Sequence, residues 1–186
     1  RQMCIRDSAS TGRATLLTQI GIMDGDGQLL GPDEMGEIVL SGDLVMTGYY
    51  KMPDKTAETI IDGWLHTGDI GYIDSRGYVF IKDRIRDVVI TGGFNVYPSD
   101  VEAVLGRHPD IRECVVFGVA DEKWGEAVHA AVELHDGATT SAADIIEFVK
   151  QQLDSVKAPK AVHITQSLPR SPVGKVLRRA AKELFA

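Results

Sequence analysis

The sequence predicts an α+β protein in two parts: a small β-rich, distorted barrel-like subdomain, followed by a compact α+β domain. Three observations predict this architecture. Residues 13–82 contain extended apolar runs joined by turns rich in Gly and Asp, residues 83–87 are mostly charged, and residues 88–186 alternate between strand-like and helix-like segments. Turn residues between alternating runs are typical of hairpins, and mixed signals beyond a linker are typical of a second, α+β domain.

The first part is expected to consist of hairpins with one short helix. Its strands are expected at 16–23, 36–40, 64–72 and 78–81. The run Asp24-Gly25-Asp26-Gly27 forms the first turn, because these residues tolerate positive φ. A short helix is expected at 53–61, since Pro53 is favoured in a first helical turn.

The second part is expected to alternate strands and helices. The strands are expected at 88–90, 113–119, 127–134 and 161–165, and the helices at 98–105, at 141–153 and from Lys175 onward. Ser141 is placed to cap its helix. The apolar residues that follow it, from Ile145 to Val149, recur at the spacing of one helix face.

The boundary between the parts is predicted at 83–87, because the run from Lys82 to Asp87 holds five charges in six residues, as an exposed linker does. At the other end, residues 1–12 start with Arg1 and have no helical or strand periodicity near their beginning. They are expected to be foreign or disordered, and the chain is expected to be a fragment of a longer protein.

Composition narrows the function. Of 186 residues, 44% are hydrophobic and 25% charged, as in ordinary globular proteins, and the net charge of −7 argues against a nucleic-acid-binding surface. No apolar run approaches the roughly 20 residues that span a bilayer. The two cysteines and five histidines have no metal-ligand spacing, so no metal site is expected. These features predict a cytoplasmic protein.

Two short motifs have ordinary explanations. The run from Asp24 resembles the start of a calcium loop, but Leu29 and Met35 stand where that loop needs Gly and Glu. Gly174-Lys175 resembles the end of a phosphate-binding loop. That motif needs Gly where Pro169 stands and Ser or Thr where Val176 stands, so it is excluded.

Three segments carry chemistry of their own. Trp64-Leu-His-Thr-Gly-Asp69 places a carboxylate at a bend, where it suits a ribose diol. Asp83-Arg84 leads to Thr91-Gly92-Gly93, whose glycines allow a ligand close to the backbone. Pro169-Arg-Ser-Pro-Val-Gly-Lys175 is a stiff loop that holds one Lys ahead of a helix. Taken alone, that chemistry favours a solvated surface charge for Lys175.

The order and spacing of the three segments together resemble the adenylate-forming (AMP-binding) superfamily, which includes acyl-CoA synthetases, luciferases and nonribosomal-peptide adenylation domains. The resemblance runs from about Gly12 to the end of the chain and includes Gly36-Glu-Ile-Val-Leu and Gly48-Tyr-Tyr. Gly93-Phe-Asn-Val-Tyr-Pro98 and Trp124-Gly-Glu126 are most similar to fatty-acyl-CoA ligases.

The resemblance implies a ligase of fatty-acid metabolism. It activates a carboxylic acid with ATP to an acyl-adenylate and then transfers the acyl group to CoA. Residues 13–82 would be the last subdomain of the large adenylation domain, 83–87 the hinge, and 88–186 the mobile C-terminal domain. The implied residue roles are ribose binding by Asp69 and Arg84, the pivot at Arg86, approach to the pantetheine arm at Gly92 and Gly93, and catalysis of adenylation by Lys175.

The same resemblance implies what lies elsewhere. The ATP phosphate loop, the Mg²⁺ site and the acyl pocket belong to a missing N-terminal region, so the fragment by itself is expected to be inactive. Two alternatives stay open. The enzyme could use another acceptor, such as a carrier protein, or the chain could be a non-catalytic nucleotide-binding module.

Overall fold

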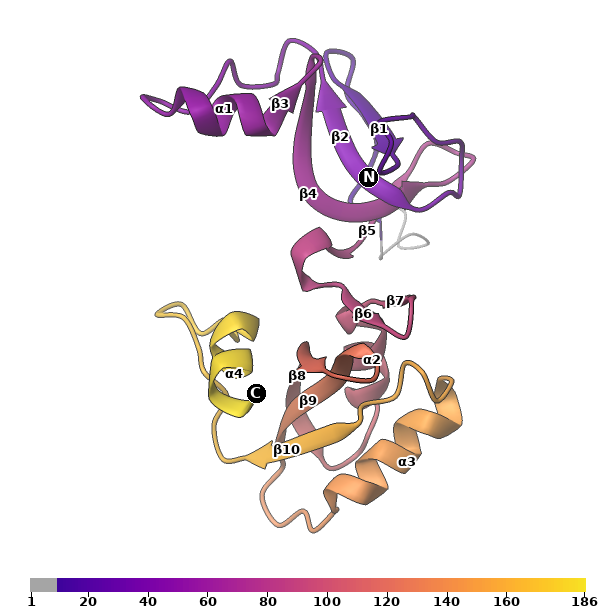
Figure 1. Ribbon diagram of the computed structural model, residues 1–186, viewed down its shortest axis with the longest axis vertical. Coiled ribbons are helices and arrows are strands. Elements are labelled where there is room, and N and C mark those ends of the chain that lie inside the picture. The colour runs from indigo at the N-terminus through magenta and orange to yellow at the C-terminus, as the bar shows by residue number, and fades with distance from the viewer. Residues whose placement is uncertain (1–9) are drawn as a thin grey trace, which may run out of the picture. The chain divides into compact units, whose positions relative to one another are not determined.

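The computed structural model describes residues 10–186, which divide into two compact units at Arg86–Asp87 (Figure 1). Both units mix strands and helices, which confirms the predicted α+β class. The break falls inside the predicted linker, whereas a hinge motion there stays a prediction. Residues 1–9 of the segment predicted to be foreign lie outside the described residues. Its last residues are ordered, because the Thr11 N–H donates to the Val79 carbonyl.

The first unit is a curled antiparallel sheet of five strands. The elements are β1 (Gln19–Met23), β2 (Gly36–Ser41), α1 (Pro53–Thr59), β3 (Ile60–Ile61), β4 (Trp64–Ile73) and β5 (Val79–Arg84). β4 is long and bent, so its beginning pairs with β3 and its end with β5, while β2 runs along its other edge (Figure 1). Ile22, Ile38 and Val79 form a small core under the sheet.

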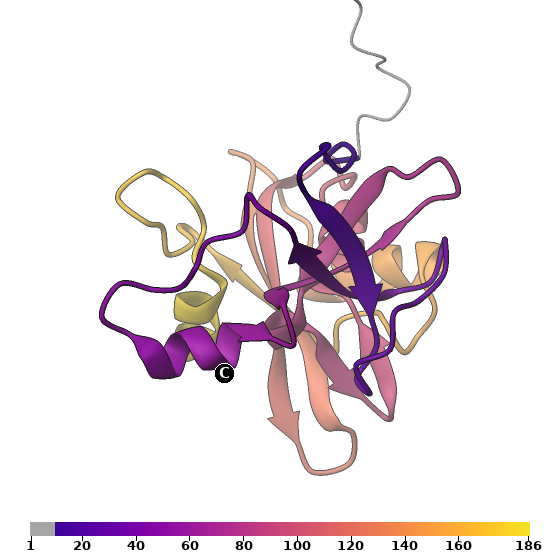
Figure 2. The ribbon, with the colours of Figure 1, turned by 90° about the horizontal axis from the view of Figure 1, so that it is seen from above.

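The second unit is built around β9. Its elements are β6 (Val89–Thr91), β7 (Phe94–Val96), α2 (Pro98–Leu105), β8 (Ile111–Asp121), β9 (Gly125–Leu134), α3 (Ala142–Gln152), β10 (Ala161–Thr165) and α4 (Arg178–Phe185). The short 3-10 helix η2 (Ile85–Asp87) leads into it. β9 pairs antiparallel with β8 and β6 and parallel with β10. Figure 2 shows β8 and β9 as one long hairpin.

Both faces of this sheet are covered. On one face, Val116 and Val128 pack with Val101 of α2 and Ile145 of α3. On the other, Phe117 and its neighbours pack with the last helix and the loop before it. α3 and α4 accordingly lie on opposite sides of the sheet in Figure 1. Double coverage explains why β8 and β9 are apolar almost without alternation.

Four elements differ from the sequence-based expectation. The predicted helix at 53–61 ends at Thr59, because Ile60–Ile61 pair with β4 as the strand β3. The last helix begins at Arg178, three residues after Lys175, because residues 169–177 form a hairpin-like loop before it. The strand β7 was not predicted, since its three residues are too short to give a periodic signal. Residues 83 and 84 extend β5, and the Asp83 side chain is buried, so the charged stretch is less exposed than predicted.

The start of α3 agrees with the prediction. Ser141 is its N-cap: the Ser141 hydroxyl accepts the Asp144 N–H (3.2 Å), and the Asp144 carboxylate accepts the Ser141 N–H (3.1 Å). This reciprocal pair is a capping box.

In the part of the chain that the structure describes, no helix is long and apolar enough to cross a bilayer.

Replacing Ser141 with Ala is expected to lower the free energy of unfolding of the second unit by about 1 kcal/mol, because one helix N–H loses its acceptor. The two tryptophans, Trp64 and Trp124, lie in different units. Urea unfolding followed by fluorescence in a Trp64→Phe background therefore reports the second unit. The neighbouring exposed Thr139→Ala is the control. Equal midpoints for Ser141→Ala and Thr139→Ala would contradict the expectation.

Candidate functional site

Asp69 and Arg84 lie side by side in the first unit. They face each other across β4 and β5, and Arg84 Nε is 2.6 Å from Asp69 Oδ1. The Asp69 side chain is 21% exposed and that of Arg84 54% exposed, so both remain reachable from solvent. The structure therefore brings together the two residues predicted to hold the ribose; the role itself stays a prediction.

Asp69 owes its place to a bulge in β4. Between the β2 partners Glu37 and Val39 the register shifts, and Thr67, Gly68 and Asp69 leave the regular pairing with β2. Gly68 has φ +72°, and its N–H donates to Glu37 Oε1 (2.9 Å). A bulge next to a site re-aims a side chain.

Glu37 supports this bulge from the neighbouring strand. Its second oxygen lies 2.7 Å from His66 Nδ1, while the Thr67 hydroxyl donates to the Ile38 carbonyl (2.6 Å). The sequence analysis quoted Glu37 only within Gly36-Glu-Ile-Val-Leu and gave it no role, because no local pattern shows that its carboxylate meets the backbone at residue 68. The predicted pivot, Arg86, lies in η2 at the unit boundary and is exposed.

Gly92 and Gly93 form the tip of the β6–β7 hairpin in the second unit. Their φ angles are +58° and +82°, as a two-residue turn of type I′ requires. The Gly92 N–H donates to the Trp124 carbonyl (2.8 Å), and a Cβ on Gly92 would lie 3.0 Å from the Trp124 ring. Around Gly93, nothing lies within 4 Å of such a Cβ. The tip thus combines one packed glycine with one open glycine.

Lys175 ends a tight turn. The Ser171 carbonyl accepts the Gly174 N–H (2.8 Å), Pro172 takes the second turn position, and Gly174 has φ +84°. The Ser171 hydroxyl accepts the Lys175 N–H (3.1 Å), and the Ser171 N–H donates to the Lys175 carbonyl (2.8 Å). The backbone of Lys175 is therefore held on both sides.

The side chain of Lys175 is free by contrast. It is exposed, and among residues 10–186 no carboxylate forms an ion pair with its ammonium. A cation on a rigid backbone without an internal partner is suited to bind an anion from outside the unit.

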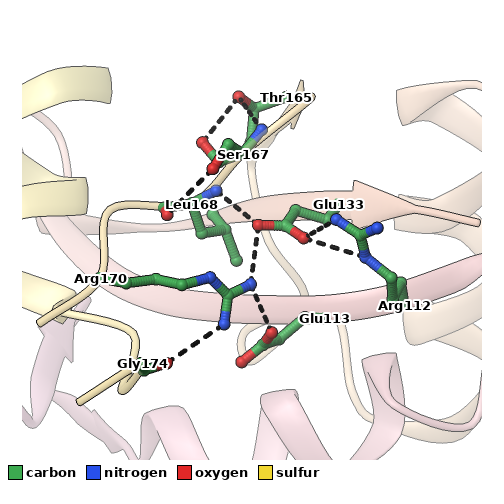
Figure 3. A network of polar contacts seen from close by, with 8 residues as sticks. All are labelled: Arg112, Glu113, Glu133, Thr165, Ser167, Leu168, Arg170 and Gly174. Atoms are coloured by element: carbon green, nitrogen blue, oxygen red, sulfur yellow. Dashed lines mark hydrogen bonds and ion pairs between the residues drawn. The ribbon is translucent and has the colours of Figure 1, made fainter. Parts of the chain in front are cut away.

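Two arginines anchor the chain on either side of Lys175. Downstream, Arg178 at the start of α4 donates to Asp87 (2.9 Å) and to both oxygens of Glu102 (2.9 and 3.0 Å). Upstream, Arg170 donates to Glu113 (2.6 Å) and to Glu133 (2.9 Å). Figure 3 shows the Arg170 side chain pointing between these two carboxylates. The loop between the anchors is therefore fixed at both ends.

Glu133 is the buried centre of the upstream network. Its side chain is only 1% exposed, and it accepts from the Leu168 N–H (2.6 Å), from Arg170 and from Arg112 Nε (3.0 Å) (Figure 3). Burial by itself raises the pKa of the Glu133 carboxyl. The hydrogen bonds from Leu168, Arg112 and Arg170 outweigh burial and lower the pKa from 4.5 to about 2. Glu133 is therefore ionised at neutral pH.

The two predicted loops of the second unit attach near opposite ends of β9. Gly92 bonds to Trp124, directly before β9, whereas the loop of Lys175 is anchored on Glu133, the last residue but one of that strand. Sequence analysis found Lys175, Gly92 and Gly93 but did not assign Arg170, Glu133 or Trp124 a role. Only the fold reveals those contacts, because their partners are distant in the chain.

Known proteins share sequence and fold with this chain. Residues 100–175 match the family model of the AMP-binding enzyme C-terminal domain. A fatty acid–[acyl-carrier-protein] ligase, ScoC, of Streptomyces coeruleorubidus is 48% identical over 88% of this chain and 32% of its own length. A medium/long-chain-fatty-acid–CoA ligase of Mycobacterium tuberculosis is 43% identical over 95% of this chain and 32% of its own length. The chain thus spans about a third of these relatives.

Among solved structures, ATP-bound MatB from Rhodopseudomonas palustris has a TM-score of 0.90 and 37% identity, over 95% of this chain and 36% of that one. The second unit therefore contains the AMP-binding enzyme C-terminal domain. Residues 100–175 belong to the AMP-binding enzyme C-terminal domain family, and the chain is similar in sequence to fatty acid–carrier-protein and fatty acid–CoA ligases.

Replacing Glu133 with Gln is expected to destabilise the second unit in a pH-dependent way. Because the folded pKa lies below the unfolded value of 4.5, the ionised carboxylate stabilises the fold above pH 4.5, and this contribution is lost as pH falls toward 2. The difference in unfolding free energy between wild type and Glu133→Gln should therefore shrink from about pH 6 to about pH 3.

Urea unfolding at several pH values measures this difference. Glu147→Gln, at an exposed position of α3, is the control and should show little effect throughout. A Glu133→Gln difference that stays constant over the whole range would mean that the ionised form is not what stabilises the unit.

Proposed function

We propose that these residues form the C-terminal part of an AMP-forming acyl-CoA ligase, with Lys175 as the catalytic residue of its adenylation step. One observation carries the proposal: the Lys175 ammonium is exposed and without an ion-pair partner among residues 10–186, on a backbone held by Ser171. In adenylation, negative charge gathers between the attacking carboxylate and the α-phosphate of ATP. A preorganised ammonium stabilises that charge.

The remaining roles follow the same assignment. Asp69 accepts hydrogen bonds from the ribose hydroxyls of the adenylate, and Arg84, paired with it at 2.6 Å, contacts the ribose as well. Arg86 serves as the pivot between the units. ATP, Mg²⁺ and the carboxylic acid are held by a region N-terminal to these residues, and the enzyme acts in the cytoplasm. By itself, the chain described here is expected to be inactive.

The second half-reaction uses the other end of β9. After rotation of the second unit, Gly92 and Gly93 come close to the pantetheine arm of CoA, whose thiol attacks the acyl-adenylate and releases AMP. The empty space around Gly93 supports this assignment. Domain rotation that presents different surfaces in turn belongs to the known repertoire of closure motions.

A carrier protein is the second candidate acceptor. It is favoured by the name of ScoC, a fatty acid–[acyl-carrier-protein] ligase that is 48% identical to this chain. Both acceptors end in the same phosphopantetheine arm, so the hairpin chemistry is equal for the two. Thioester formation with CoA and with holo-carrier protein, measured side by side in the full-length enzyme, distinguishes them.

Replacing Lys175 with Ala in the full-length enzyme is expected to slow acid-dependent pyrophosphate release from ATP by roughly a hundred- to a thousand-fold, because one transition-state contact is lost. Thioester formation from supplied acyl-adenylate and CoA should stay near the wild-type rate. Exposed Lys150→Ala, on α3, is the control and should change neither step. Undiminished pyrophosphate release in Lys175→Ala would make Lys175 a surface charge and remove the basis of the proposal.

Replacing Gly93 with Ala tests the acceptor step, and Gly137→Ala is a matched control. The two glycines have φ of +82° and +80°, and neither has an atom within 4 Å of an added Cβ. Each substitution should cost a similar stability of about 1–2 kcal/mol from the left-handed backbone. Only Gly93→Ala should slow thioester formation from acyl-adenylate. If both variants slow it equally, the hairpin tip does not meet the acceptor.

A further inference from the structure

The side chain of Arg170 connects the peptide group before Lys175 to the sheet. Its Nη2 donates to Glu133 Oε1 (2.9 Å) and Glu113 Oε2 (2.6 Å), while Nη1 points back to the Gly174 carbonyl (3.4 Å). That carbonyl belongs to the peptide bond that leads into Lys175. One planar guanidinium therefore joins two carboxylates of the sheet to the peptide group beside the proposed catalytic residue (Figure 3).

Of the two carboxylates that accept from Arg170, Glu133 is held by burial and by further hydrogen bonds. Glu133 lies in β9 on the face of the sheet that α4 covers. Its side chain is 1% exposed, and the Leu168 N–H and Arg112 also donate to its oxygens. Leu168 itself is buried, at 2% exposure, and packs in the cluster under α4. The loop is thus attached to a fixed point by its backbone at 168 and by its side chain at 170.

The stability of the fold does not by itself explain why this position holds a buried ion-pair network. A buried ion pair is often no more stabilising than apolar residues of the same volume, because its desolvation penalty offsets the attraction. Its geometry is directional, however, and a planar guanidinium with fixed donors holds a single orientation. Such a directional contact can fix the position of the loop to which the arginine belongs.

The formal charges of the network around Glu133 sum to zero. Two arginines, Arg112 and Arg170, meet two glutamates, Glu113 and Glu133. Its long-range field on Lys175 is therefore small, and an effect on Lys175 has to be transmitted through the loop backbone.

We propose that Arg170, seated on Glu133 and Glu113, is a positioning residue for adenylation, which fixes the Gly174–Lys175 peptide and so aims the Lys175 ammonium. The inference rests on the proposed function of Lys175. Arg178 holds the other end of the loop on Glu102 and Asp87, so loss of Arg170 frees one end only. A displacement of about 1 Å from the reacting groups costs up to a hundred-fold in rate, and partial release about ten-fold.

Arg170→Ala and Arg112→Ala form a matched pair for the test. Each variant removes one arginine from Glu133. Arg112 lies on β8, and among residues 10–186 it forms no hydrogen bond or ion pair with the loop of Lys175. In the full-length enzyme, Arg170→Ala should lower kcat for pyrophosphate release about ten-fold with little change in KM for ATP. Arg112→Ala should change it less than about two-fold, and thioester formation from acyl-adenylate should be unchanged in both.

A double variant separates positioning from general damage. If Arg170 acts through Lys175, then Lys175→Ala/Arg170→Ala should release pyrophosphate no more slowly than Lys175→Ala alone. Additive losses, or equal losses in Arg170→Ala and Arg112→Ala, would overturn the inference and leave the proposed function standing. Unchanged pyrophosphate release in Lys175→Ala would instead defeat the proposed function itself, so the two failures are distinguishable.

Glu113→Gln covers the case in which Arg170→Ala loses both half-reactions through misfolding. Glu113 is 40% exposed and contributes one of the Arg170 contacts, so its loss perturbs the seat without opening the core. A loss in pyrophosphate release of about two- to three-fold, with normal thioester formation, would support the inference. No change in this variant would then count against it.

Discussion

Glu133 places a carboxylate on the face of the sheet that α4 covers, and the loop before α4 supplies two of the donors that satisfy it. A buried charge without hydrogen-bond partners is costly, so the sheet can close under α4 only if donors reach both oxygens. They come from three places: the Leu168 backbone, Arg112 on β8 and Arg170 in the loop before α4. The requirement of one carboxylate therefore fixes the path of the chain that leads to Lys175.

Strand carboxylates hold the other candidate segments in the same way. Glu37 accepts the Gly68 N–H and so holds the bulge that presents Asp69. Glu126 accepts the Ile90 N–H (3.0 Å) and holds β6, the strand before the glycine turn. In each case a strand carboxylate captures a backbone N–H that the regular ladder leaves unpaired, which a folded chain has to satisfy. Segments that depart from regular structure are thereby kept rigid, as sites with placed side chains need.

The strand β9 holds the two candidate loops of the second unit at its opposite ends. The glycine turn attaches at the Gly125 end and the Lys175 loop is anchored at Glu133, so one strand carries both proposed reaction surfaces. A strand rises about 3.3 Å per residue, so the two attachment points are separated by most of the length of a ten-residue strand. This layout is compatible with the proposed two-step ligase, in which the unit would present one end of β9 in each step.

The sequence by itself predicted the fold class and most elements, because turns and caps are local signals. The helix at 98–105, the strand at 161–165 and the Ser141 cap illustrate this. The candidate residues Asp69, Arg84, Gly92, Gly93 and Lys175 came from the resemblance of three motifs, in their order and spacing, to a known family. Only the tertiary structure decided that Arg84 pairs with Asp69, that α4 starts at Arg178, and that Arg170 reaches Glu133, 37 residues away. These contacts depend on strand register and on what covers each face. No local pattern records either, since a Glu in β9 looks like any other strand residue until the sheet is assembled.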